Sequence, residues 1–117
     1  MIAHIVLFKP KADVASDQRR ALAESLRLAC LQAASVRRAM VGRIADLGAG
    51  YAKGFGDTTY EYVAILEFDD RAGLMAYFAH PLHEDLARRF WETCESTVII
   101  DVDGGDPRTE SIVHQLV

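Results

Sequence analysis

The order in which strand-like and helix-like segments follow one another constrains the fold of this chain more than any other feature. Four segments are short, apolar and bounded by proline, glycine or charged residues, as is typical of strands; they cover residues 2–9, 36–44, 60–68 and 97–103. Two longer segments repeat apolar residues at three- and four-residue spacing, as amphipathic helices do; they cover residues 16–33 and 70–95. The chain therefore reads strand, helix, strand, strand, helix, strand.

This order predicts a ferredoxin-like α+β fold. Such a βαββαβ chain forms one four-stranded antiparallel sheet with strand order 4-1-3-2, and both helices pack on one face of it. A chain of 117 residues has room for a single core, so we expect one domain over residues 1–103 and a C-terminal extension over residues 104–117. We also expect Ser16 to be the N-cap of the first helix and the glycine-rich residues 45–57 to form a mobile loop.

The strands carry apolar residues on both of their faces. In the third strand Val63 and Ile65 alternate with Ala64 and Leu66, and the first strand is apolar enough to be buried on both faces. The helices can cover only one face of the sheet, and an exposed apolar sheet is an association surface. We therefore expect a homodimer whose two sheets pack face to face about a two-fold axis, and the C-terminal extension could pack against the partner.

Charge and hydropathy argue against two classes of partner. The net charge is −4, and acidic and basic side chains are interspersed without a basic stripe, so nucleic-acid binding is not expected. No segment is long enough to span a bilayer, and the first strand lacks the features of a signal peptide. We therefore expect no membrane partner and, by default, a cytoplasmic location. Cys30 and Cys94 fall on predicted helices and are expected to be buried thiols rather than a disulfide.

The seven residues from Tyr77 to His83 hold the densest group of proton-carrying side chains. Pro81 has no amide hydrogen and clashes with the preceding turn, so one helix should end before it and another should begin at it. His80 is pushed towards extended backbone and should hold the bend. His83 would then lie in the first turn of the second helix, where the helix dipole favours a neutral imidazole that can accept a proton. The simpler interpretation is that Tyr77 and His80 are half-buried surface residues that cap the kink.

Several segments of the chain resemble the stress-responsive dimeric α+β barrel family, and together they extend over residues 2–103. They are the opening strand from His4 to Lys9, the strand from Tyr62 to Phe68, the kinked segment from Tyr77 to His83, the triplet Phe90-Trp91-Glu92 and the last strand from Val98 to Asp101. The resemblance implies a ferredoxin-like fold and a dimer that closes into a barrel. Most members of that family have no established reaction.

One branch of the family, the olivetolic acid cyclase-like proteins, closes a linear polyketide by aldol condensation without a cofactor. The functional groups of that branch match His4, Tyr77, His83 and Asp101. The resemblance therefore implies a polyketide cyclase-like catalytic site made of these four residues.

The predicted topology supports part of this site independently. The first and fourth strands should be antiparallel neighbours, so His4 at the start of one lies near Asp101 at the end of the other. For a substrate with an acidic carbon beside a carbonyl group, His83 would be the base and Asp101 would orient it. Tyr77 or His4 would donate a hydrogen bond to the carbonyl oxygen. This chemistry requires neither a cofactor nor a metal. The wall of the substrate pocket would include Phe8, Tyr62 and Phe90.

Each of these residues also has a simpler structural role. His4 could bond the backbone at a strand edge, and Asp101 could cap the strand end or pair with an arginine. Tyr77 could pack in the core with its hydroxyl satisfied. Phe90 and Trp91 fit the core better than a substrate wall.

Two classes of function fit these observations. The first is a cofactor-independent acid–base enzyme, such as a cyclase, lyase or isomerase, that acts on a small hydrophobic carbonyl compound. The second is a non-catalytic dimeric protein that binds a small apolar ligand or serves a stress response. A relative of the cofactor-free monooxygenases is a third possibility, since one fold hosts many functions. A metal bound by His80 and His83 is a further alternative, although the kink breaks their spacing.

Overall fold

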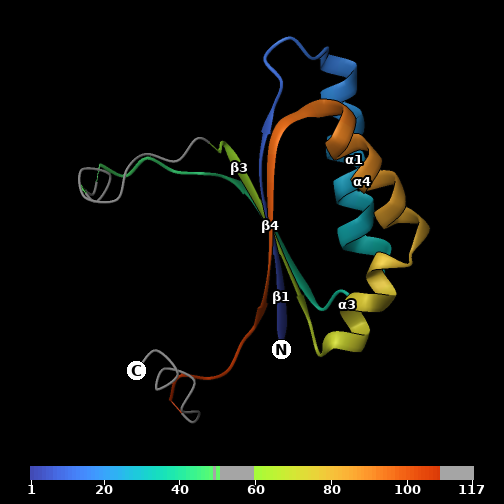
Figure 1. The fold of residues 1–117 in the computed structure, drawn as a ribbon, viewed down its shortest axis with the longest axis vertical. Coiled ribbons are helices and arrows are strands. Elements are labelled where there is room, and N and C mark those ends of the chain that lie inside the picture. The colour runs from blue at the N-terminus through green and yellow to red at the C-terminus, as the bar shows by residue number, and fades with distance from the viewer. Residues whose placement is uncertain (49, 51–59, 109–117) are drawn as a thin grey trace.

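The computed structural model describes residues 1–48, 50 and 60–108. The strands are β1 (Ile2–Pro10), β2 (Arg38–Arg43), β3 (Tyr62–Phe68) and β4 (Cys94–Asp103). The helices are α1 (Ser16–Gln32), α3 (Arg71–Phe78) and α4 (Pro81–Thr93). Figure 1 shows the sheet edge-on, with all three helices on one face of it.

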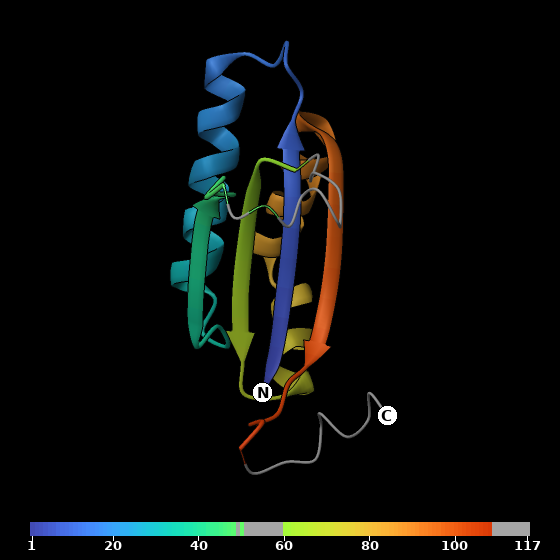
Figure 2. The ribbon, with the colours of Figure 1, turned by 90° about the vertical axis from the view of Figure 1, so that its left-hand side faces the viewer.

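The strands form one antiparallel sheet in the order β2-β3-β1-β4. This is the predicted order, read from the opposite edge, and the ferredoxin-like α+β fold is confirmed. β1 lies between β3 and β4, so its residues face partners on both sides. Figure 2 shows the other face of the sheet, which none of the described helices covers.

β1 alternates strictly between its two faces. Its even residues, among them His4, Val6 and Phe8, are buried under the helices, whereas its odd residues are only half-buried on the other face. The expectation that this strand is buried on both faces is therefore wrong for the single chain, because the helices cover one face only.

The uncovered face of the sheet, which we call the outer face, is apolar. The strand registers align Met40, Ile65, Ile5 and Ile100 in one row across all four strands. The adjacent row contains Val63, Leu7 and Val98. A monomer would leave both rows in contact with water.

The first helix begins one residue earlier than its predicted cap implies. Ser16 is the first helical residue, the N-cap position belongs to Ala15, and no side chain caps it by a hydrogen bond. The prediction of Ser16 as the N-cap is therefore wrong. The helix buries Leu22, Leu26 and Ala29 against the rest of the core, as its apolar spacing predicts.

The kink at Pro81 separates two helices, as predicted. Asp70 caps α3, because its Oδ1 accepts a hydrogen bond from the Gly73 amide at 2.9 Å. His80 has extended backbone and caps α4, and its Nδ1 accepts a hydrogen bond from the Leu82 amide at 3.1 Å. Pro81 is the first residue of α4, where its missing amide hydrogen costs nothing. His83 consequently lies at the third position of α4.

α4 passes into β4 without a loop. The helix ends at Thr93, two residues before its predicted end, and Cys94 starts the strand with extended backbone. The placement of Cys94 on a helix is therefore wrong. Cys30 and Cys94 are both free thiols.

Residues 104–108 leave the end of β4 on the side away from the helices (Figure 1). The remainder of the C-terminal extension lies outside the described residues, as does most of the glycine-rich loop. Within the described part of the chain, no helix is long and apolar enough to cross a bilayer.

Candidate active site

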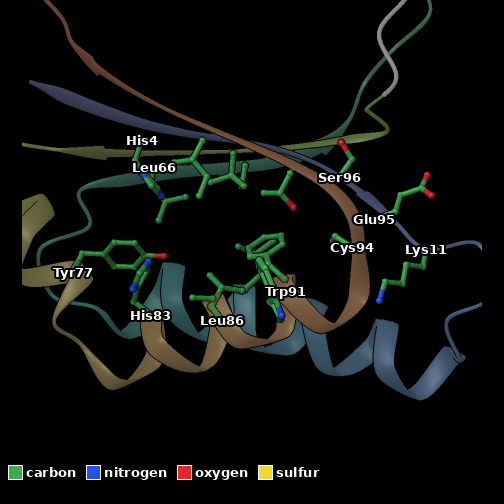
Figure 3. Close-up of a pocket in the computed structure, with 17 residues that line it drawn as sticks. His4, Lys11, Leu66, Tyr77, His83, Leu86, Trp91, Cys94, Glu95 and Ser96 are labelled. Carbon is green, nitrogen blue, oxygen red and sulfur yellow. The ribbon is translucent and has the colours of Figure 1, made fainter.

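A pocket of about 770 Å³ lies between the inner face of the sheet and the helices. This volume falls within the range of about 300–1,000 Å³ that is typical of small-ligand sites. Most of the lining is apolar and includes Val6, Leu26, Leu66, Leu86, Phe90 and Ile99. At one end, however, His4, Tyr77 and His83 come together from β1, α3 and α4 (Figure 3).

His4 and Asp101 form a close pair across two neighbouring strands. They are directly opposite each other in the β1–β4 register, and His4 Nδ1 lies 2.6 Å from Asp101 Oδ1. The imidazole is only 3% exposed, whereas the carboxylate remains partly exposed. The predicted proximity of these residues is confirmed. A carboxylate that accepts the Nδ1 hydrogen fixes the tautomer and leaves Nε2 of a neutral ring without a hydrogen.

Tyr77 lies between the two histidines. Its ring centroid is 4.9 Å from that of His83 and 6.0 Å from that of His4, and its side chain is 2% exposed. No described residue forms a hydrogen bond with its hydroxyl group, and Figure 3 shows the phenolic oxygen pointing into the pocket. Burial, with a smaller effect from Cys30, raises the pKa of Tyr77 well above its ordinary value. The phenol therefore stays protonated and can donate a hydrogen bond.

His83 is half-buried and lines the pocket on the helix side. Burial lowers the pKa of its imidazole, and the nearby His4 lowers it further. A hydrogen bond with the main chain of Phe78 and the charge of Glu84 act in the opposite direction. The net effect favours a neutral ring at neutral pH, which is the form that accepts a proton.

The structure corrects the predicted partner of Asp101. This carboxylate was expected to orient His83, but it bonds His4 instead. The reason is geometric: Asp101 and His4 lie on adjacent strands in direct register, whereas His83 approaches the pocket from the helix layer.

The predicted wall of the pocket is also partly wrong. Phe90 lines the pocket, but Phe8 and Tyr62 do not. Phe8 packs behind the wall, with ring centroids 4.9 Å from Phe90 and 5.5 Å from Tyr62. Trp91 was expected in the core, yet it is 87% exposed and contributes to the pocket lining.

The helix that carries His83 is fixed to α1 by a polar contact. The buried Ser25 hydroxyl donates to Asp85 Oδ2 at 2.8 Å, and Arg89 Nε donates to the same oxygen at 3.0 Å. These hydrogen bonds, with the Ser25 contribution the largest, lower the pKa of Asp85 to about 2. Sequence reasoning missed this contact because neither Ser25 nor Asp85 lies in a recognisable motif.

The other polar residues of the lining were also missed. Lys11, Glu95, Ser96 and Thr97 also line the pocket, and ordinary surface residue types carry no signal of such a position. Among the described residues, no cluster of three or more side chains is suited to hold a metal ion. The polar groups of the pocket are thus imidazoles, a phenol and surface side chains, which suit proton transfer and hydrogen bonding.

Several solved structures share this fold. Hydroxynitrile lyase from Passiflora edulis is 19% identical with a TM-score of 0.70, and the match covers 91% of this chain and 96% of the lyase. A Dabb family protein with a ferredoxin-like fold from Mesorhizobium loti is 22% identical with a TM-score of 0.68, covering 90% of this chain and 97% of the other.

A third structure is a dimeric protein of unknown function with a ferredoxin-like fold from Bacteroides fragilis. It is 25% identical with a TM-score of 0.61, and the match covers 88% of this chain and 95% of that protein. No curated protein matches the sequence. The family model of the stress responsive A/B barrel domain, Dabb, matches residues 2–103. This chain therefore belongs to the Dabb family.

Proposed function

We propose that this protein is a cofactor-independent acid–base enzyme that acts on a small hydrophobic carbonyl compound. The observation that carries the proposal is the convergence of two imidazoles and a phenol at one end of an otherwise apolar pocket. An apolar pocket selects a hydrophobic substrate, and three proton-carrying groups at one place suit removal of a proton beside a carbonyl group.

His83 is the proposed base. Its lowered pKa keeps the ring neutral, so it can take the proton from the carbon next to the carbonyl group. The electron pair of that C–H bond forms a carbon–carbon double bond, the π pair of the carbonyl group moves to its oxygen, and an enolate results. Tyr77, which keeps its proton, donates a hydrogen bond to this oxygen as its charge grows. The enolate carbon is then free to attack a second carbonyl group, as in a cyclase, or to be reprotonated, as in an isomerase.

His4 and Asp101 are the proposed second acid–base pair. Asp101 occupies Nδ1 of His4, so the other ring nitrogen is available to the substrate. If His4 receives a proton, the carboxylate 2.6 Å away compensates its charge. This pair can therefore return a proton to an intermediate that His83 and Tyr77 have generated.

The experiment follows the first step of this chemistry rather than a guessed reaction. The exchange of the acidic hydrogens of a hydrophobic β-diketone with deuterium from the solvent is measured by NMR, with and without the protein. His83→Gln is expected to slow the catalysed exchange by about 10² or more. His80→Asn is the matched control, because it removes an imidazole from the same segment but keeps a good helix cap. The base assignment fails if both variants exchange as fast as the unaltered protein.

A non-catalytic binding protein is the second candidate, and the mainly apolar lining favours it. The two functions separate in the same experiment. An enzyme accelerates the exchange, whereas a binding protein perturbs the diketone signals without accelerating it.

We also propose that the protein works as a homodimer joined through its outer faces. The apolar rows on the outer face, and a relative of the same fold that is dimeric, support this arrangement. Ile5 lies near the middle of that face, so Ile5→Asp is expected to give a monomer in light scattering coupled to size-exclusion chromatography. Met75→Asp, a substitution at an exposed apolar position on α3, should leave the dimer intact. If Ile5→Asp remains dimeric and folded, the subunits associate elsewhere.

A further inference from the structure

The pocket has a second polar end, which the proposed acid–base chemistry does not use. Figure 3 shows His4, Tyr77 and His83 at one end and Lys11, Glu95 and Ser96 at the other. Leu86 and Trp91 lie between the two ends (Figure 3). The pocket is therefore polar, apolar and polar again along its length.

The strand register gives the distance between these ends. His4 faces Asp101 near one end of the β1–β4 pair, and Lys9 faces Ser96 near the other end. At a rise of about 3.3 Å per residue, the five steps from His4 to Lys9 correspond to about 17 Å. A ligand that fills the pocket is thus extended rather than compact.

Positive charge dominates the second end. The carboxylate of Glu95 is already paired with Lys9 at 3.1 Å. Lys11 Nζ instead donates to the main-chain oxygen of Glu92 at 3.2 Å, and Arg19 donates to the Lys11 carbonyl oxygen at 3.0 Å. Within the described residues, neither Lys11 nor Arg19 forms an ion pair.

The contact with Glu92 also gives Lys11 a structural role, because a cation stabilises the C-terminal end of a helix. That contact occupies one of the three hydrogens of the ammonium group. The remaining hydrogens are available to a ligand. Burial raises the pKa of the Cys94 thiol in the pocket lining, and Arg19 and Lys11 both act against this rise. The two cations are therefore close enough to act on the pocket.

We propose that the substrate is an elongated amphiphile with a carboxylate at the end opposite its reacting carbonyl group. Lys11 binds the carboxylate with electrostatic support from Arg19, and the apolar body lies against Leu86 and Trp91. This inference rests on the proposed function, because it places the reacting carbonyl group at Tyr77 and His83. It adds a specificity-determining residue, Lys11, to that function.

Two matched ketones test the proposal. The first is a straight-chain methyl ketone of about eleven carbons, which approaches the span of the pocket. The second is the same ketone with a carboxylate in place of its terminal methyl group. Their dissociation constants are measured by isothermal titration calorimetry at low ionic strength, with the unaltered protein and with two variants. Lys11→Met removes the proposed contact, and Arg20→Met removes an equal charge from a position outside the pocket lining.

The carboxylate form is expected to bind about twofold to fivefold more tightly than the plain ketone, as for an exposed ion pair. Lys11→Met should abolish this difference, added salt should reduce it, and Arg20→Met should keep it. Circular dichroism confirms that each variant is folded. Equal binding of both ketones by the unaltered protein, or a Lys11→Met variant that retains the difference, overturns the inference and leaves the proposed function standing. If neither ketone binds, the proposed carbonyl pocket itself is wrong.

Discussion

Removal of the Tyr77 hydroxyl group should slow the proposed reaction while leaving the free energy of unfolding almost unchanged. Tyr77 is 2% exposed, and its ring packs 5.4 Å from the Phe68 ring and 4.9 Å from the His83 ring, measured between centroids. Tyr77→Phe keeps this ring and all of its packing. The hydroxyl group forms no hydrogen bond with a described residue, so its removal leaves no partner unsatisfied.

The expected change in the free energy of unfolding is therefore within about 0.5 kcal/mol. A hydroxyl group with a buried hydrogen-bond partner would instead cost about 1–3 kcal/mol when removed. Catalysis should respond very differently. If Tyr77 donates to the developing enolate oxygen, its loss should slow the deuterium exchange by about 10² to 10³.

Two measurements on the same variant decide the question. Urea unfolding with linear extrapolation gives the stability, and the NMR exchange assay gives the activity. Tyr77→Ala is the contrasting variant, because loss of a buried ring should cost about 3–5 kcal/mol. A Tyr77→Phe protein that loses more than about 1 kcal/mol of stability but keeps its exchange rate would refute this reasoning. The hydroxyl group would then be a structural one.

Two further predictions concern the helix that carries the proposed base. Because the pKa of His83 is lowered, the rate of catalysed deuterium exchange should stay constant as the pH falls from neutrality to the ordinary imidazole pKa of 6.5. The rate should decline only at a pH below 6.5, and a pH–rate profile would check this. The same shift predicts lower stability in mild acid, because the unfolded chain takes up the His83 proton at a higher pH than the folded chain does; His83→Gln should remove this slope from unfolding curves. Ser25→Ala removes a buried donor to Asp85 and should cost about 1–2 kcal/mol, measured by urea unfolding. NMR titration of Asp85 should show its pKa rising from about 2 towards the ordinary value, and an unchanged pKa would contradict the role given to the serine hydroxyl.

The kink at Pro81 illustrates what local sequence can predict. A proline cannot lie inside a helix, and the residue before it avoids helical backbone, whatever the rest of the protein does. The end of α3, the cap at His80 and the start of α4 all follow from these two rules. The pairing of His4 with Asp101 was predictable for a different reason. Once the order of the elements indicates the fold, the first and last strands must be antiparallel neighbours.

The errors concern side chains whose position depends on the docking of the helix layer on the sheet. Asp101 was assigned to His83, but strand register brings it to His4. Phe8 and Tyr62 were placed on the wall of the pocket, yet Phe90 covers that region and Phe8 packs behind it. A small change in how the helices pack on the sheet decides which side chains line the pocket and which lie behind them. The spacing of apolar residues along the chain does not specify this packing.

By itself, the sequence determined the order of the elements, the helix break at Pro81 and the set of proton-carrying side chains available for a site. These follow from steric rules and apolar spacing, which act over a few residues. Only the tertiary structure decided that Trp91 faces solvent at the rim of the pocket and that Lys11 lies at the end opposite the histidines. These features depend on how α4 is oriented between α1 and β4, and that orientation arises from contacts between residues far apart in the chain.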